Sequence, residues 1–319
     1  NGDGSRAGGP QGDDTMAGHP PNLPASIHQR LLNQAKEQNR PLQELLQYFA
    51  IERFLFHLSH SPHATRFYLK GALMLRIWDA PLSRPTIDVD LMGRQVLSQD
   101  ELKQVIKDIC VHTVPDDGCR FEAATVRVQP IRLEDQYGGI RVAFTSHIGK
   151  IRLHMQVNVG FGDVIVPGPI PIDFPALLDF PSPHLLAYSP ESAIAEKFQA
   201  MVLLDSANSR MKDFYDIWLL ARSHPFKGSV VSHALQATFT RRQTPFPVDI
   251  PTALTDRFVK DRLKQTQWNA FVRKGHLAAE QVSLREVVEL RRDFLMPPMR
   301  AAANSERFDR HWPAGGPWT

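Results

Sequence analysis

The chain has 319 residues, of which 42% are hydrophobic, and a formal net charge of +3. This length can bury a full core in one large or two medium domains, and the weak positive charge permits nucleic-acid contact without arguing for it. Two cysteines are too few for a disulfide framework or a thiolate metal site. No apolar run reaches the ~18 residues of a membrane span. We therefore expect a cytoplasmic protein without membrane contact.

Two helices are predicted before the first strand. Residues 1–22 are rich in Gly and Asp without periodicity, and we expect them to be a disordered tag or leader. A helix with Ile27 and Leu31 on its apolar face follows, and a second one runs from about Leu42 to Ser59. The second helix is apolar on most of its surface and is therefore expected to pack in a core.

The stretch 67–92 carries the clearest chemical pattern. A short apolar strand ends at Lys70-Gly71, and a short helix and a proline-punctuated turn come next. Residues 86–92 then alternate strictly, which predicts a strand with Asp88 and Asp90 on one face. The opposite face of that strand is expected to be buried and carries Ile87, Val89 and Leu91.

Asp88 and Asp90 form a candidate metal site. Two carboxylates two residues apart on a strand project the same way, about 6.5 Å apart, and repel each other unless a cation lies between them. Such oxygen ligands suit Mg²⁺ together with substrate phosphates, and Gly71 at a helix start lets backbone N–H groups approach a phosphate. The alternative for each feature alone is structural: a solvated strand face and an ordinary helix start.

A helix and three strands are predicted next. A capping box at Ser98–Glu101 starts a helix that ends near Val111, and strands are expected at about 123–132, 139–147 and 150–159. If the last of these strands lies beside 86–92, Asn158 shares the face of the carboxylates. The loop that follows could direct Asp163 at the same cleft.

After a proline-rich linker at about 165–183, the chain is predicted to be mainly helical. A helix that starts at Ser189-Pro190 carries Lys197 within its apolar stripe, where a lysine must either meet a charge or extend its ammonium to the surface. The pattern therefore predicts an α/β (α+β) protein, with a catalytic domain at 23–180, a helical domain at 184–300 that completes the active site, and a disordered tail at 301–319.

Charged residues gather where the next helix starts, near Met211. Asp213 suits the first turn of a helix, whereas Asp216 lies past it. Arg210 and Lys212 could hold a polyphosphate or an RNA backbone. A basic segment at about 257–274 is either a solvated face with core anchors or a second surface for RNA.

Five segments of the chain also occur, in this order, in a known family: Leu69-Lys-Gly-Ala-Leu, Arg84-Pro-Thr-Ile-Asp-Val-Asp-Leu, Val159-Gly-Phe-Gly-Asp163, Ala195-Glu-Lys-Phe and Asn208-Ser-Arg-Met-Lys-Asp-Phe-Tyr-Asp-Ile. Together they resemble the AbiEii/AbiGii-type toxin family of nucleotidyltransferases, which has the DNA-polymerase-β-like nucleotidyltransferase fold with a mixed sheet. The resemblance is collinear from about Leu23 to Phe246.

The resemblance implies transfer of a nucleoside monophosphate from an NTP, with Mg²⁺ or Mn²⁺, to an RNA acceptor, in particular tRNA. It also implies a toxin–antitoxin or phage-defence setting with a cognate antitoxin protein. Implied catalytic residues are Asp88, Asp90, Lys197 and Asp216, and implied metal ligands are Asp88, Asp90, Asn158 and Asp163. Implied nucleotide contacts are Lys70, Gly71, Ala72, Arg84, Thr86, Arg210 and Asp213. In this interpretation Lys197 neutralises triphosphate charge, and Asp216 positions either the acceptor hydroxyl or a second-shell base.

One residue departs from the family pattern, because Asn158 stands where a third acidic residue is usual. In two-metal transfer that carboxylate helps to hold the catalytic metal and to activate the acceptor. Asp163 compensates, one metal suffices, or catalysis is impaired. The alternatives are therefore a binder of NTP or RNA without turnover, a protein that acts by sequestering a partner, and a transferase with a small-molecule or protein acceptor.

Overall fold

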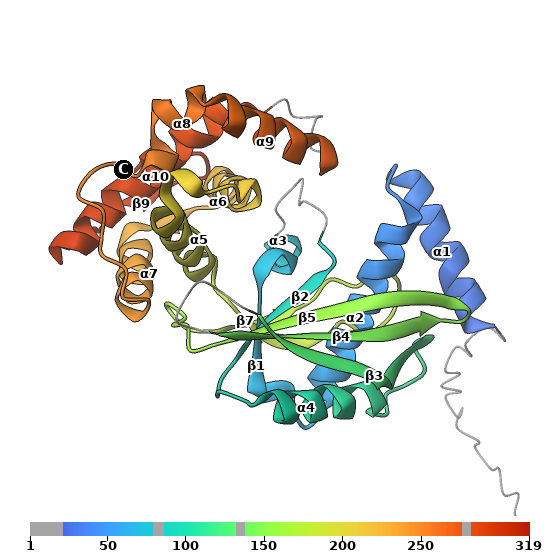
Figure 1. The fold of residues 1–319 in the computed structure, drawn as a ribbon. Coiled ribbons are helices and arrows are strands. Elements are labelled where there is room, and N and C mark those ends of the chain that lie inside the picture. Colours follow the sequence, from blue (N-terminus) through green and yellow to red (C-terminus); the bar gives the residue numbers. More distant parts are fainter. Residues whose placement is uncertain (1–21, 79–85, 132–137, 276–281) are drawn as a thin grey trace, which may run out of the picture.

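The computed structural model describes residues 22–78, 86–131, 138–275 and 282–319, whose arrangement is shown in Figure 1. Seven strands form a mixed sheet in the order β3-β4-β5-β2-β1-β7-β6. They are β1 (Phe67–Lys70), β2 (Asp88–Gly93), β3 (Cys119–Ile131), β4 (Gly139–Ile148), β5 (Ile151–Phe161), β6 (Ile170–Asp173) and β7 (His184–Ala187). The three strands predicted between residues 123 and 159 are confirmed as β3, β4 and β5.

Helices precede, interrupt and follow this sheet. They are α1 (Leu23–Glu37), α2 (Leu42–His60), α3 (Met74–Ile77), α4 (Gln99–Val111), α5 (Pro190–Leu204), α6 (Met211–Ser223), α7 (Gly228–Arg241), α8 (Asp256–Lys260), α9 (Arg262–Lys274) and α10 (Leu284–Asn304). A mixed sheet with helices, followed by a mainly helical region, confirms the predicted α/β (α+β) fold class.

Helices α2 and α4 cover one face of the sheet. Helix α2 packs against β3, β4 and β5, and α4 packs against β3. The amide of Gln47 on α2 contacts the sulfur of Met155 on β5, so the apolar alternate residues of β5 face these helices. The polar alternate residues of β5 consequently project from the opposite face, which is the face that carries the site.

The alternation predicted for 86–92 is correct for the strand itself but not for its start. Val89 and Leu91 are buried, whereas Ile87 is 61% exposed. The expectation that Ile87 belongs to the buried face was wrong, because β2 begins at Asp88 and Ile87 lies before the sheet.

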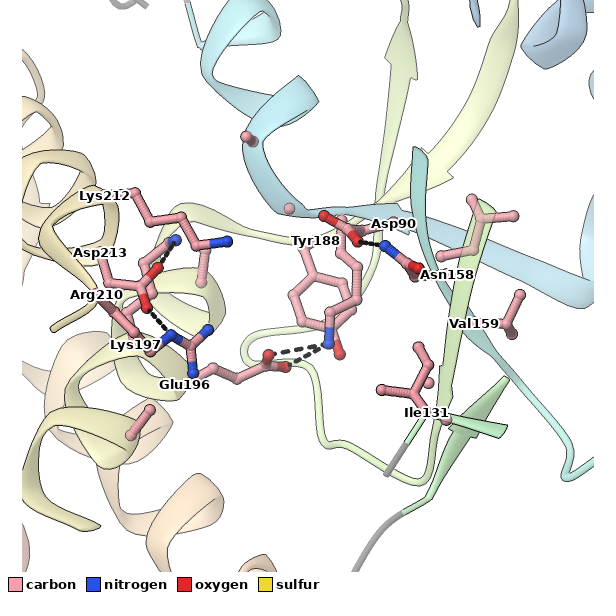
Figure 2. A pocket seen from close by; sticks show the side chains of 18 of the residues that line it. Asp90, Ile131, Asn158, Val159, Tyr188, Glu196, Lys197, Arg210, Lys212 and Asp213 are labelled. Atoms are coloured by element: carbon pink, nitrogen blue, oxygen red, sulfur yellow. Dashed lines mark hydrogen bonds and ion pairs between the residues drawn. The ribbon is translucent and has the colours of Figure 1, made fainter. Parts of the chain in front are cut away.

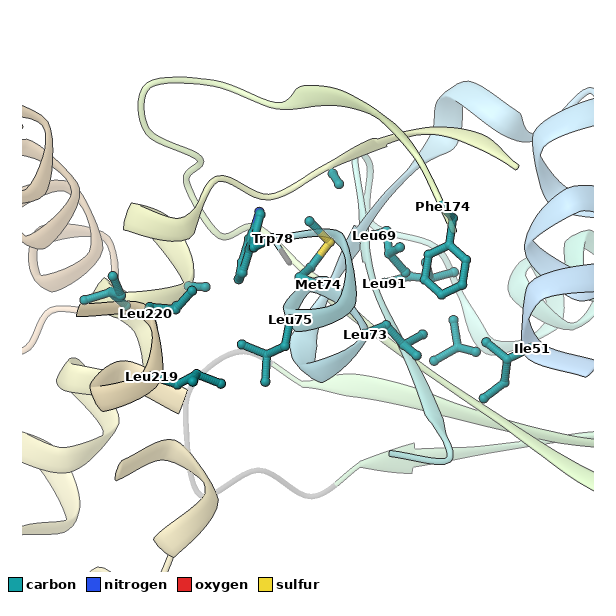
Figure 3. Packing of buried hydrophobic residues seen from close by; sticks show 14 of the residues in the cluster. Ile51, Leu69, Leu73, Met74, Leu75, Trp78, Leu91, Phe174, Leu219 and Leu220 are labelled. Atoms are coloured by element: carbon teal, nitrogen blue, oxygen red, sulfur yellow. The ribbon is translucent and has the colours of Figure 1, made fainter. Parts of the chain in front are cut away.

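Helices α5 to α10 gather at one end of the sheet (Figure 1). One continuous apolar cluster joins the two regions: Leu73 and Leu75, on the short helical segment around α3, belong to the same cluster as Ile51 on α2 and Leu220 on α6 (Figure 3). Strand β7 pairs with β1 and β6, so the sheet extends into the residues assigned above to the helical domain. The division near residue 180 stays a prediction.

The expectation of a disordered tail at 301–319 is corrected by the structure. Helix α10 continues to Asn304, and β9 (His311–Trp312) pairs with β8 (Phe226–Lys227). The indole N–H groups of Trp312 and Trp318 donate to backbone carbonyls of α6 and α10, and both rings pack on Phe294. Two buried indoles hold the tail against the helices despite its Pro/Gly-rich composition.

In the described part of the chain, no helix combines the length and apolarity that a membrane span requires.

Candidate active site

A row of four polar residues crosses four adjacent strands at one level. Arg141 on β4 is paired with Asn158 on β5, Asn158 with Asp90 on β2, and Asp90 with Lys70 on β1. Residues directly opposite each other on neighbouring strands point to the same face of a sheet. All four side chains therefore project from the face that α2 and α4 leave uncovered.

Amide groups hold both aspartates of β2. The Asn158 side-chain N–H donates to Asp90 Oδ1 at 3.0 Å, and the Gln156 side-chain N–H donates to Asp88 Oδ1 at 2.8 Å. The oxygen of Asn158 in turn accepts a hydrogen bond of 3.0 Å from Arg141 Nε. The expected place of Asn158 beside the carboxylates is thus what the register of β2 and β5 produces.

Gly71 brings the backbone directly against Asp90. Its φ of +78° lies in the left-handed region, and a Cβ at this position would lie 2.1 Å from Asp90 Oδ2. Any other residue would meet both a backbone penalty and a steric clash. The carboxylate of Asp90 is therefore enclosed between the Gly71 backbone and the Asn158 amide.

This row forms one wall of a cavity of about 290 Å³, and α5, α6 and the end of α7 form the other (Figure 2). Seven of the site residues expected from the sequence line it together with Asp90: Lys70, Gly71, Ala72, Asn158, Lys197, Arg210 and Asp213. Asp88 and Thr86 lie farther back along β2 and the segment before it, and Thr86 N donates to the Tyr48 hydroxyl. Arg84 lies outside the described residues.

Lys70 lies at the centre of a partly buried ion cluster. Its ammonium donates to Asp163 Oδ2 at 3.0 Å and to Glu196 Oε2 at 2.9 Å, and it lies 4.8 Å from the centre of the Tyr188 ring. Arg242, directly after α7, donates to Asp163 at 2.9 Å and lies 3.3 Å from Glu196. Two cations and two carboxylates thus connect β1, the loop after β5, α5 and α7.

The opposite charges in this cluster shift the pKa values of Asp163 and Lys70, and they also affect the adjacent Tyr188. Burial acts to raise the pKa of Asp163, but the charges of Lys70 and Arg242 lower it to about 2. Burial acts to lower the pKa of Lys70, yet Glu196 and Asp163 hold it above its usual value. Burial, with the nearby Glu196 and Asp163 charges, raises the pKa of Tyr188, so its phenol stays protonated.

Lys197 belongs to a second cluster on the helical wall. Its ammonium donates to Asp213 Oδ1 and to Asp216 Oδ2, each at 2.8 Å, and Arg210 Nε lies 2.8 Å from Asp213 Oδ2. Of the two possibilities for a lysine within an apolar stripe, the structure shows the one in which it meets charges. Lys197 and Asp90 lie on opposite walls of the cavity (Figure 2).

Asp213 and Asp216 are placed differently with respect to the cavity. Burial acts to raise the pKa of Asp213, but Lys197 and Arg210 keep it below its usual value. The Asp216 carboxylate is fully buried behind Lys197 and is not part of the cavity lining. Asp216 therefore contacts Lys197 from behind and does not reach the cavity itself.

The donor set fits a metal that arrives with its substrate. In the described residues, no three His, Cys, Asp or Glu side chains gather in an arrangement that would hold a metal ion. Each aspartate of β2 uses Oδ1 for an amide, and Asp90 Oδ2 faces Gly71 at the cavity. Mg²⁺ is commonly bound by one or two carboxylates together with substrate phosphates. Asp88 and Asp90 can provide the carboxylates.

Two expected ligands do not fit that metal. Asp163 is occupied by Lys70 and Arg242, and Asn158 directs its N–H rather than its oxygen at Asp90. Four residues that shape the site are not among those expected from the sequence: Arg141, Gln156, Glu196 and Arg242. Glu196 adjoins Lys197 within a quoted motif, and the polar alternation of β5 includes Gln156. No pattern indicated Arg141 or Arg242.

Comparison with known proteins gives one strong match. A family model described as "Nucleotidyl transferase AbiEii toxin, Type IV TA system" matches residues 53–292. No curated protein matches the sequence. Two Helicobacter pylori structures cover 82% of this chain: JHP933, at 13% identity, 93% of its own chain and a TM-score of 0.46, and a candidate nucleotidyltransferase, at 14% identity, 96% of its own chain and a TM-score of 0.44.

Proposed function

The chain belongs to the AbiEii family of toxin nucleotidyltransferases, and on that premise we propose that it transfers a nucleoside monophosphate from a Mg²⁺-bound NTP to an RNA acceptor, most specifically tRNA. The observation that carries this proposal is the cavity with Asp90 against Gly71 on one wall and Lys197, Arg210 and Lys212 on the other. A carboxylate for a metal and a set of cations for phosphates face each other across it.

The helical wall supplies the positive charge that a triphosphate needs. Lys212 is exposed, lines the cavity and has no ion-pair partner within the described ranges. Arg210 is about half exposed although it pairs with Asp213. Both can turn toward a phosphate without leaving a buried carboxylate unpaired, so we assign them to triphosphate binding, with Lys197 held more rigidly between its two aspartates.

The proposed reaction is nucleotidyl transfer. A hydroxyl oxygen of the acceptor attacks the α-phosphorus, the bond from that phosphorus to the β-phosphate oxygen breaks, pyrophosphate leaves, and the hydroxyl proton passes to water. Mg²⁺, when bound with the nucleotide at Asp88 and Asp90, supplies charge neutralisation at the phosphate oxygens. Lys197 and the cations beside it stabilise the charge on the departing pyrophosphate.

The test is a transfer assay with purified protein, total RNA, Mg²⁺ and each labelled NTP in turn. We expect one nucleotide to label a band of tRNA size, and Asp88→Asn to abolish the label. Asp293→Asn, which removes an exposed carboxylate on α10 away from the cavity, is the matched control and should label like the wild type. No labelled RNA with any NTP would contradict the proposal.

Asn158 supports a second candidate function, a protein that binds NTP without turnover. Calorimetry distinguishes the two. Binding of an NTP without any labelled product, unchanged in Asn158→Asp, would favour the binder; labelled product in the wild type would exclude it. If the acceptor is a small molecule or a protein, the label would appear outside the RNA. Because the family consists of toxins of toxin–antitoxin systems, we also propose a cognate antitoxin protein as a partner.

A further inference from the structure

The orientation of the Asn158 amide is fixed by its two neighbours. Arg141 on one side can only donate hydrogen bonds, and the carboxylate of Asp90 on the other can only accept them. The amide oxygen must therefore face Arg141 and the N–H group must face Asp90. Asn158 has no oxygen left to direct at a metal beside Asp90.

A carboxylate at the position of Asn158 would create a different site. It would stand directly opposite Asp90 on a neighbouring strand, because the two positions are in register. Like charges in that arrangement repel, and a metal ion between them relieves the repulsion. The amide donates a hydrogen bond instead, so Asp90 is stabilised without a cation.

Asp163 does not take over the role of the missing carboxylate. It is one of the two carboxylates in the partly buried cluster with Lys70 and Arg242, and it is absent from the cavity lining. Moving it to a metal would leave these two partly buried cations with one carboxylate fewer, which is a costly change. On β1, β2, β4 and β5, all of which the structure describes, Asp88 and Asp90 are the two carboxylates.

We propose that Asn158 and Arg141 replace a second metal. The site takes a single divalent cation, which binds together with the triphosphate. The Arg141–Asn158 pair holds Asp90 in place of a second cation. This inference rests on the proposed function for its nucleotide. It assigns Arg141 a positioning role that acts on Asp90 through Asn158.

The test counts bound Mn²⁺ by electron paramagnetic resonance of the free ion, first with protein alone and then with a non-hydrolysable NTP analogue. The wild type should bind Mn²⁺ weakly alone and one ion per chain with the analogue. Asn158→Asp/Arg141→Gln removes the amide and the cation that would neutralise the new carboxylate. It should bind two ions with the analogue, and should bind Mn²⁺ alone at least about tenfold more tightly than the wild type.

The matched control is His154→Asp/Arg141→Gln, which makes the same change in charge. His154 is an exposed residue on the same face of β5, four residues before Asn158. This variant lacks Arg141 but keeps the amide opposite Asp90, so it should still bind one ion with the analogue and should show no tenfold gain in Mn²⁺ affinity without it. A similar gain in the control would show that net charge, rather than the place opposite Asp90, determines metal binding, and would overturn the inference.

Two further results would also overturn it: two ions bound by the wild type with the analogue, or equal Mn²⁺ affinity of the wild type and Asn158→Asp/Arg141→Gln without it. Failure of the proposed function looks different. In that case the transfer assay gives no labelled RNA with any NTP, while the titration with metal alone still decides the inference.

Discussion

Asp90 and Asp213 lie on opposite walls of one cavity and are held in opposite ways. Asp90 accepts a hydrogen bond from a neutral amide and touches a glycine, whereas Asp213 is paired with Lys197 and Arg210. The sheet wall thus keeps a carboxylate that can still bind a cation. The helical wall uses its carboxylates to hold cations in place. Under the proposed function, a carboxylate binds the metal on one wall, whereas carboxylates hold lysine and arginine side chains in place on the other.

The largest effect should come from breaking the helical wall. Lys197→Met removes the ammonium that two buried carboxylates accept from, and we expect a loss of about 3–5 kcal/mol in the free energy of unfolding together with loss of transfer. Urea denaturation measures the first and labelled-NTP transfer the second. Adding Asp216→Asn should recover part of the stability but not the transfer. Full stability of the single variant would mean that the cluster contributes nothing.

Breaking the sheet wall should affect chemistry alone. Asp90→Asn keeps an oxygen that accepts from Asn158, so the free energy of unfolding should change by less than about 1 kcal/mol. The transfer rate should nevertheless fall by more than about 100-fold, because the carboxylate that would bind the metal is gone. Initial rates and urea denaturation of the same preparations check both. A stability loss as large as that of Lys197→Met would erase the contrast between the walls.

The contribution of the Lys70 cluster to stability can be measured separately, through its dependence on pH. The folded pKa of Asp163 is lowered to about 2, so the stability it contributes is present above its unfolded value near 4 and is lost as the pH falls through about 2. This amounts to about 2 kcal/mol. The stability advantage of the wild type over Asp163→Asn should therefore be constant above about pH 5 and shrink by that amount toward pH 2, as measured by urea denaturation. A constant difference over that range would show that Asp163 is not paired.

The smallest effect is expected at the exposed cation. Lys212→Ala should weaken binding of a non-hydrolysable NTP by about tenfold, or ~1.4 kcal/mol, because it removes one phosphate contact. Its stability should stay within about 0.5 kcal/mol of the wild type. Calorimetry measures the binding, with Lys150→Ala in the exposed turn between β4 and β5 as the control. Equal affinity of the wild type, Lys212→Ala and Lys150→Ala would show that Lys212 does not contact the triphosphate.

The sequence predicted residues on both walls but not the contacts between distant segments, for a physical reason. Asp90 and Asn158 lie on strands with strict alternation, so their shared face followed once the two strands were assumed to be neighbours. Arg242 is 79 residues from Asp163, and their contact depends on how α7 packs beside the loop after β5. No local periodicity encodes such packing.

Two errors have the same origin. Ile87 follows the alternation of β2 but lies outside the sheet, because the period of a strand does not indicate where its pairing begins. The prolines and glycines of the tail predict disorder, whereas Trp312 and Trp318 attach it to α6 and α10. In both cases contacts between distant segments decided the outcome.

The most direct test is a crystal structure of the protein with Mn²⁺ and a non-hydrolysable NTP analogue, with the metal located by its anomalous scattering. The account predicts an anomalous peak beside Asp88 and Asp90, with the triphosphate between that wall and Arg210 and Lys212. A peak at Asp213 and Asp216, or a nucleotide bound outside the cavity, would contradict it.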